Sequence, residues 1–221
     1  MKILVIGASR GIGLELVRQY REAGNAVTAS ARDDAGLERL RALGATPIKI
    51  DVADAASAAG LAGQIDGAGF DVAIVNAGVA GTLAPGLSAP TEADFDQVMR
   101  TNVLGPMRVI PQIVEALAAG GKLAVLSSRM GSIGSRTSAG SSVYRASKSA
   151  VNSVVKDASL SFADRAICVA FHPGWVRTDM GGSGADIDVA TSVTGMRRVI
   201  AALTADDNGA FLNYDGQTIP W

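Results

Sequence analysis

The chain has 221 residues, 48% of them hydrophobic and only 5% aromatic, which suits one α/β domain with a core of Ala, Val, Ile and Leu. Its formal net charge of −1 offers no electrostatic case for binding nucleic acid or an anionic membrane surface. The single cysteine, Cys168, excludes an internal disulfide and fits a reducing compartment, so we expect a cytoplasmic protein.

Short apolar runs typical of buried strands recur along the chain. They lie at residues 2–7, 26–31, 46–51, 71–78, 122–128, 166–174 and 210–216. The first run is too short for a signal peptide, and no segment approaches the roughly 18 apolar residues of a membrane span. We therefore expect a protein without a membrane partner.

Longer stretches with helical period separate these runs. Residues 14–24 and 36–44 each carry an apolar stripe and end at a glycine, Gly24 or Gly44, as helices commonly do. The alternation predicts an α/β, doubly wound Rossmann fold, with a seven-stranded, mostly parallel sheet and helices on both faces. Without a linker or repeat, we expect residues 1–221 to form a single domain that binds its ligand at the carboxyl ends of the strands.

Two motifs suggest chemistry. The stretch "GASRGIG" (7–13) follows the first strand and opens the first helix, where glycines and a helix N-terminus suit a phosphate, although a plain turn is the alternative. In "YRASK", Tyr144 and Lys148 are one helical turn apart and share a face, although a solvated helical pair is the usual reading of such spacing.

Four further stretches occur in order with these two: "VNAG" (75–78), "TNV" (101–103), "SSRMG" (127–131) and "HPGWVRTDM" (172–180). Together the six motifs resemble the short-chain dehydrogenase/reductase family along the whole chain, with Val75 in place of the family's first Asn. Within the family, "HPGWVRTDMGG" and the terminal "YDGQTIPW" are most similar to the C-factor-like branch and its carbonyl-reductase relatives.

The resemblance implies an enzyme that interconverts a carbonyl (aldehyde or ketone) and an alcohol through Asn102, Ser128, Tyr144 and Lys148. Tyr144 is the acid in reduction and the base in oxidation, and Lys148 lowers its pKa from about 10 and holds the nicotinamide ribose. Ser128 stabilises charge on the substrate oxygen, and Asn102 anchors a water that passes protons from Lys148.

Ser128 lies 16 residues before Tyr144, a longer separation than is common in the family. We expect the extra residues to bulge outward in the Gly/Ser-rich loop, which leaves Ser128 in place. Ser127 and Ser132 are the alternatives for its role.

The resemblance also implies a nicotinamide cofactor and no metal. The residues implied to contact the cofactor are Gly7, Ser9, Arg10, Gly11, Ile12, Gly13, Arg32, Asp51, Val52, Asn76, Ala77, Gly78, Tyr144, Lys148, Pro173, Gly174, Val176 and Thr178.

We expect NADP(H) to be preferred over NAD(H). A site that prefers NAD(H) places a carboxylate at the end of the second strand, where this chain has Ala31 followed by Arg32. Arg10 brings a second cation for the 2′-phosphate. NAD(H) remains possible, because Asp33 or Asp34 could contact the ribose if the strand ended later.

Several other residues carry weaker signals. Arg145 is expected to be exposed, and His172 is expected to have a hydrogen-bonded structural role. Trp175 either lines the pocket or packs, and Trp221 docks the tail on the domain or a partner subunit. The Gly-rich segment 181–195 predicts an open pocket with broad specificity, or a lid that a partner supplies.

The implied partners are a small carbonyl or alcohol and a second copy of the chain, as a homodimer or homotetramer. Family members often pair through the helix that carries Tyr144, and this one bears Val151, Val154 and Val155, which could instead face the sheet. An alternative function is a cofactor-binding signalling protein of the C-factor type. A sugar-nucleotide epimerase is disfavoured, because too few residues follow Gly174 to form a substrate domain.

Overall fold

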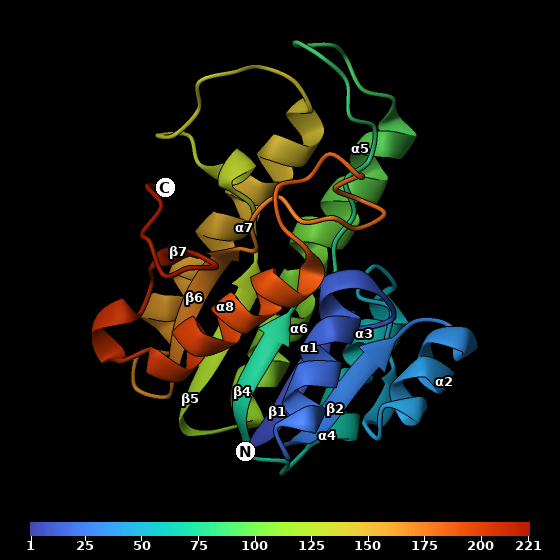
Figure 1. Cartoon of the computed structure of the whole chain (residues 1–221), viewed down its shortest axis with the longest axis vertical. Helices are drawn as coiled ribbons and strands as arrows, with labels where there is room; N and C mark the ends of the chain where they lie inside the picture. The colour runs from blue at the N-terminus through green and yellow to red at the C-terminus, as the bar shows by residue number, and fades with distance from the viewer.

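The seven apolar runs correspond to seven strands of one sheet in the computed structural model, which describes all 221 residues (Figure 1). The strands are β1 (Lys2–Ile6), β2 (Ala26–Ala31), β3 (Thr46–Lys49), β4 (Phe70–Val75), β5 (Leu117–Leu126), β6 (Ala166–His172) and β7 (Phe211–Asn213). Their order is β3-β2-β1-β4-β5-β6-β7, and every neighbouring pair is parallel. The predicted doubly wound fold is confirmed.

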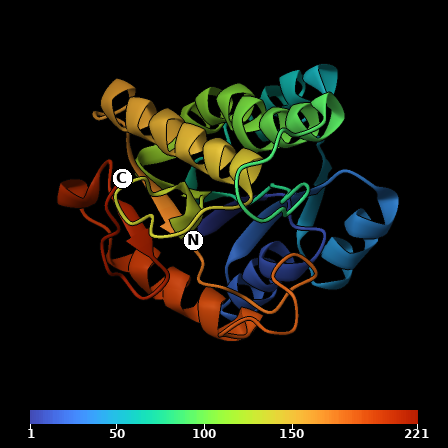
Figure 2. The same ribbon diagram turned by 90° about the horizontal axis from the view of Figure 1, so that it is seen from above.

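Helices cover both faces of the sheet, as Figure 2 shows from above. They are α1 (Gly11–Glu22), α2 (Asp34–Ala42), α3 (Ala55–Ala59), α4 (Leu61–Ile65), α5 (Glu92–Met99), α6 (Gly105–Glu115), α7 (Ser142–Ser161) and α8 (Val189–Ala202). One layer contains α1, α2 and α8, and the other contains α3 to α7. Alternate strand residues supply two cores, so that Ile3 and Val5 face one layer and Leu4 and Ile6 face the other.

The fifth strand differs from its prediction. β5 begins at Leu117, five residues before the apolar run at 122–128. Leu117 pairs with Phe70 and Lys122 with Val72, so the residues between them bulge out of register. Because this bulge contains two glycines and little apolar surface, its sequence resembles a loop more than a strand.

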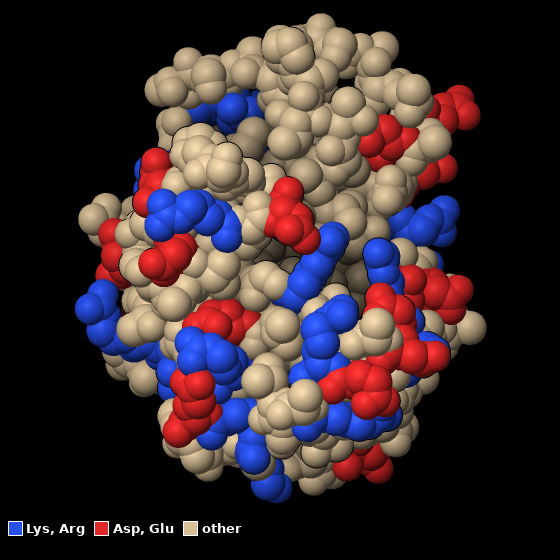
Figure 3. All heavy atoms as spheres, turned by 45° about the vertical axis from the view of Figure 1, so that its right-hand side comes forward, with Lys and Arg blue, Asp and Glu red and all other residues tan.

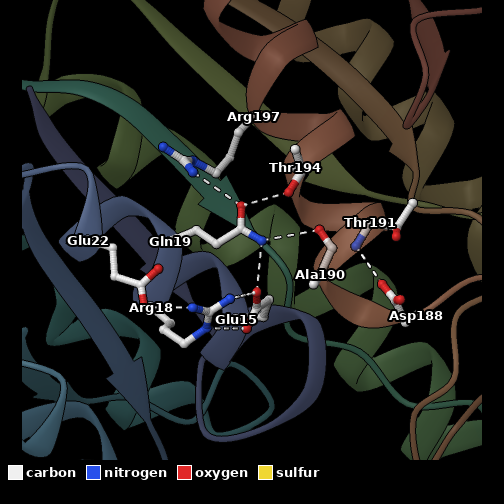
Figure 4. Close-up of polar contacts among 9 residues, drawn as sticks. All are labelled: Glu15, Arg18, Gln19, Glu22, Asp188, Ala190, Thr191, Thr194 and Arg197. Carbon is white, nitrogen blue, oxygen red and sulfur yellow. Dashed lines mark hydrogen bonds and ion pairs between the residues drawn. The ribbon is translucent and has the colours of Figure 1, made fainter.

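Polar contacts of Gln19 join α1 to α8 (Figure 4). Gln19 is only 7% exposed, and its amide nitrogen donates to the carbonyl oxygen of Ala190 at 3.1 Å. Its amide oxygen accepts from Thr194 at 3.2 Å and from Arg197 at 3.1 Å. The first turns of α8 are therefore fixed against α1, next to the loop that leaves β6.

The valines on α7 bear on the predicted homodimer. Val151 and Val155 are fully buried in the core of this chain, and Val154 packs against the same core. They give no apolar face for a partner, so they provide no support for a dimer. None of the helices is both long enough and apolar enough to span a bilayer.

Candidate active site

The glycine loop packs against the turn that follows β4. Gly7 has φ +84°, and a Cβ there would lie 2.7 Å from the backbone of Ala77. A Cβ on Gly13 would meet the carbonyl oxygen of Gly7 and the side chain of Asn76, whose amide donates to that same oxygen. Gly7 and Gly13 are therefore needed for close packing, which leaves the start of α1 facing the carboxyl ends of the strands.

The N-terminus of α1 is free to receive an anion. Arg10 provides no side-chain cap, the first turn contains no acidic residue, and the amides of Gly11, Ile12 and Gly13 donate to nothing in the chain. Thr178 lies 3.5 Å from the position that a Cβ of Gly11 would take, so the loop after β6 closes over this end. Unpaired amides at a helix N-terminus fit the phosphates of a dinucleotide.

Asn102 connects three parts of the site. It lies in a π-helix (Arg100–Leu104) between α5 and α6 and is only 1% exposed. Its Oδ1 accepts from the amide of Val79 at 2.8 Å, and its Nδ2 donates to the carbonyl of Val79 at 2.8 Å and to Ser147 at 3.0 Å. The side chain thus holds the turn after β4 against α7.

Lys148 lies in the same buried cluster. It is 6% exposed, and its Nζ donates to the carbonyl oxygen of Leu126 at 2.9 Å. A Cβ on Gly78 would lie 3.3 Å from Oδ1 of Asn102 and 3.5 Å from Nζ of Lys148, so both polar groups face this glycine. Burial lowers the pKa of Lys148 to about 8.

The pKa of Tyr144 shifts in the direction opposite to the one predicted. Burial raises the pKa of Tyr144 above its ordinary value of 10.0, and a hydrogen bond with Ser128 acts against this rise. The Nζ of Lys148 lies 5.8 Å from the centroid of the Tyr144 ring. The expected lowering by Lys148 is therefore wrong, because desolvation of the phenol is the largest effect on its pKa.

Ser128 is the serine that faces Tyr144. The hydroxyl of Ser127 donates to Oδ1 of Asn152 and also lies 3.3 Å from the carbonyl oxygen of Lys148, and the hydroxyl of Ser132 donates to the carbonyl of Pro220. Ser127 also lines the pocket, but its hydroxyl and that of Ser132 are committed to these structural bonds, whereas the hydroxyl of Ser128 is the one that acts on the pKa of Tyr144.

A short 3-10 helix (Arg129–Gly131) places Ser128 despite the long separation from Tyr144. A Cβ on Gly131 would lie 2.6 Å from the carbonyl carbon of Lys148, and the carbonyl of Gly131 accepts from Ser149 at 2.8 Å. This helix therefore docks directly on α7. The loop from Ser132 to Ser141 takes up the remaining length, and in Figure 1 it extends outward at the top.

A pocket of about 520 Å³ opens between Ser128, Tyr144 and the loop after β6. Trp175 is one of the apolar side chains that line this pocket. Because it is 53% exposed, it is not packed into the core. A second cavity of about 540 Å³ lies near Tyr20 and Arg197 and contains none of the predicted site residues. We therefore place the candidate active site in the first pocket.

Three other residues differ from, or sharpen, their predictions. Arg145 is half-buried rather than exposed, because it donates to the carbonyl of Gly140 at 2.9 Å, and it lines the pocket.

The Nδ1 of His172 is buried without a hydrogen-bond partner, so the expected hydrogen-bonded role is not observed. Burial, with the charge of Arg129, lowers the pKa of His172 to about 4. Trp221 stacks on Phe211 of its own chain, with ring centroids 5.4 Å apart.

The corner after β2 contains an arginine without an acidic partner. Asp33 caps α2 by accepting from the amide of Gly36 at 2.7 Å, and Asp34 pairs with Lys49 at 2.8 Å. Arg32 is exposed and has no ion-pair partner in the chain. In Figure 3, where the side that carries α2 comes forward, Lys and Arg side chains flank a central hollow.

Arg10 and Arg39 flank the glycine loop at this corner. Arg10 pairs with Asp179 at 3.0 Å, and Arg39, which the sequence analysis missed, donates to the carbonyl of Ser9 at 2.8 Å. Only the three-dimensional packing of α2 beside the loop reveals Arg39, since nothing in its local sequence marks it.

The remaining predicted cofactor residues lie at the same edge of the sheet. The carboxylate of Asp51 accepts from the amide of Ala53 at 2.9 Å. Val52 is buried, and its side chain packs where a Cβ of Gly105 would be, so its side chain is not available to a ligand. After β6, Gly174 has φ +89°, and the carbonyl of Pro173 accepts from Ser192. Val176 is buried and forms a bridge with Ile187.

Comparisons with known proteins agree with this geometry. The model of the family described as short chain dehydrogenase matches residues 1–186. C-signal of Myxococcus xanthus is 40% identical over 154 residues, which cover 68% of this chain and 92% of that protein. Carbonyl reductase Sniffer of D. melanogaster superposes with a TM-score of 0.89 at 31% identity, covering 100% of this chain and 99% of that one. A short-chain dehydrogenase/reductase structure from Burkholderia multivorans with bound NADP gives a TM-score of 0.91 at 31% identity, with coverage of 100% and 99%.

Proposed function

Because this chain belongs to the short chain dehydrogenase family, we propose that it is an NADP(H)-dependent oxidoreductase that interconverts an aldehyde or ketone and an alcohol. One observation carries the proposal. The phenol of Tyr144 and the hydroxyl of Ser128 line the same pocket, and the buried ammonium of Lys148 lies 5.8 Å from the centroid of the Tyr144 ring.

The residues have distinct roles in this proposal. The nicotinamide, when bound, supplies or accepts hydride at the substrate carbon. Tyr144 gives a proton to the carbonyl oxygen in reduction and removes it in oxidation, while Ser128 donates a hydrogen bond to the same oxygen. Because burial raises the pKa of Tyr144, the phenol is protonated near neutral pH, which is the form that reduction needs.

Lys148 and Asn102 support these two groups. Lys148 would hold the ribose hydroxyls of the cofactor with the charged form of its amine. The side-chain bonds of Asn102 to Val79 and Ser147 hold the turn after β4, and a carbonyl oxygen has a second lone pair for a water. The water that relays protons from Lys148 stays a prediction.

Residues of the chain also fit the cofactor. The unpaired amides at the start of α1 suit the pyrophosphate, and Arg10, Arg32 and Arg39 lie where a 2′-phosphate would need cations. The similar Burkholderia structure contains NADP, which supports the preference for NADP(H). NAD(H) stays possible as a weaker alternative.

The proposal is tested by following the absorbance of NADPH and NADH with a panel of aldehydes, ketones and alcohols. We expect turnover of at least one carbonyl compound with NADPH. Binding of NADPH, seen by its fluorescence, without turnover across the panel would contradict the enzymatic proposal. That result would favour the second candidate, a cofactor-binding signalling protein, which the 40% identity to C-signal supports.

Location and assembly stay predictions. A cytoplasmic location is expected from the single cysteine. A homodimer or homotetramer is checked by sedimentation, where a mass of one 22.5 kDa chain at micromolar concentration would contradict it.

A further inference from the structure

The substrate pocket carries an excess of positive charge. Arg129, Arg136 and Arg145 line it on the side of Tyr144, and Asp186 is the one acidic residue in its lining. Arg145 is held by Gly140 and Ser138. Arg129 and Arg136 form no ion pair with a carboxylate of the chain. Two guanidinium groups are therefore available to an anion.

The charge of Arg129 acts on another residue of the same pocket. This arginine directly follows Ser128 at the start of the 3-10 helix. Its charge contributes to lowering the pKa of His172, which lines the same pocket at the end of β6. His172 is neutral near neutral pH and does not add to the positive charge.

The lining of the pocket also includes large apolar side chains that are exposed. Leu83 is 56% exposed, Trp175 is 53% exposed and Met180 is 47% exposed, and all three line the pocket with Met130. Large apolar side chains left in water around a concave site suit an aromatic ring or an alkyl chain. The pocket thus combines exposed apolar side chains with unpaired cations.

We propose that the preferred substrates are carbonyl compounds that bear a carboxylate on an apolar body, with Arg129 and Arg136 as the carboxylate subsite. This rests on the proposed function, because Tyr144 and Ser128 must bind the carbonyl oxygen of the same molecule. A guanidinium pairs with a carboxylate through two parallel hydrogen bonds, and a charged cleft concentrates ligands of opposite sign. The cofactor phosphates have other cations, Arg10 among them, at the glycine loop.

The test compares two aldehydes that differ mainly in charge, 4-carboxybenzaldehyde and its methyl ester. We expect kcat/KM with NADPH to favour the acid by about tenfold or more, which corresponds to about 1.4 kcal/mol. Arg129→Gln and Arg136→Gln should each reduce this ratio, and the double variant should remove it. Asp186→Asn should increase the ratio, because it removes the one negative charge of the lining.

The control is Arg198→Gln, which makes the same change of charge at an exposed arginine in the second cavity, away from the site. It should leave the ratio unchanged. The affinity for NADPH should also stay unchanged in all the pocket variants, and a loss of it in the arginine variants would assign these arginines to the cofactor and overturn the inference.

Two further results distinguish the inference from the proposed function. Equal turnover of the ester and the acid by the wild type, or a ratio that persists in the double variant, overturns the inference and leaves the oxidoreductase proposal standing. Turnover of no carbonyl compound at all overturns the proposed function, and the inference falls with it.

Discussion

The Nζ of Lys148 lies 5.8 Å from the centroid of the Tyr144 ring and donates at 2.9 Å to the carbonyl oxygen of Leu126. The lysine is thus tethered to the end of β5 beside the phenol. Burial dominates the acidity of both groups, since it raises the pKa of Tyr144 and lowers that of Lys148 to about 8. Each pKa is displaced toward the neutral form of its group, because burial disfavours the charged form.

The variant Tyr144→Phe should lose turnover and keep its cofactor. The ring remains in place and only the hydroxyl is removed, so the cost is that of a missing general acid, about 10²–10⁴-fold in kcat. Steady-state kinetics measure the loss, and a fluorescence titration with NADPH should give a dissociation constant close to that of the wild type. Turnover near that of the wild type would mean that another group supplies the proton.

Lys148 should make the stability of the protein depend on pH. Its pKa falls from 10.5 in the unfolded chain to about 8 in the folded one, so between these values the unfolded state binds more protons. The free energy of unfolding should therefore rise from about pH 8 to about pH 10.5, by roughly 3 kcal/mol at 1.36 kcal/mol per pH unit.

The comparison with Lys148→Met isolates this effect, because the other titrating groups are present in both proteins. Denaturant unfolding at pH values on either side of the window gives the difference. A difference between the two proteins that does not change with pH would show that Lys148 keeps its ordinary pKa.

Much of the fold could be predicted because buried parallel strands are short and apolar. The run at 26–31 coincides with β2, and Gly24 and Gly44 follow the helices with positive φ, as their sequence suggests. The early start of β5 could not be predicted. Its pairing with Phe70 across a bulge depends on a neighbouring strand and not on its own residues.

The candidate site was predictable where a motif marks it, and not where packing creates it. Local sequence marks Tyr144 and the glycine loop. Arg39 and Arg136 are visible only once α2 and the loop before α7 are placed, since arginines on exposed segments carry no local signal. The acidity of Tyr144 also depends on how deeply the phenol is buried, which spacing to Lys148 does not reveal.

The variant Gly131→Ala should damage both stability and turnover. Its Cβ would lie 2.6 Å from the carbonyl carbon of Lys148, so the 3-10 helix must move away from α7. That movement would displace Ser128 from its position near Tyr144. We expect the free energy of unfolding to fall by about 1–3 kcal/mol, as for overpacking in a core, and kcat to fall with it.

Gly134→Ala is the matched control in the same loop. A Cβ there would lie 3.4 Å from its nearest neighbour, Pro220, which is close to ordinary contact. This variant should remain near the wild type in thermal unfolding and in kcat. If Gly131→Ala were equally mild, the docking of the 3-10 helix on α7 would not be what positions Ser128.

Cofactor preference should depend on Arg32 and not on the two aspartates that follow it. β2 ends at Ala31, as the sequence predicts. Asp33 is engaged as the cap of α2 and Asp34 is paired with Lys49, so each carboxylate already has a partner within the chain. Arg32 has no such partner and can pair with a 2′-phosphate through two hydrogen bonds.

We therefore expect kcat/KM to favour NADPH over NADH by about tenfold or more, or about 1.4 kcal/mol, and Arg32→Ala to remove most of that margin. Arg41→Ala is the control, because Arg41 is an exposed arginine of α2 that pairs with Glu38. Adding Ala31→Asp to Arg32→Ala should reverse the preference, since a carboxylate repels the 2′-phosphate and accepts from the ribose hydroxyls of NADH. A wild-type preference for NADH would mean that Asp33 leaves the cap of α2 to bind the ribose. In that case NADH should stabilise the Asp33→Ala variant against unfolding less than it stabilises the wild type.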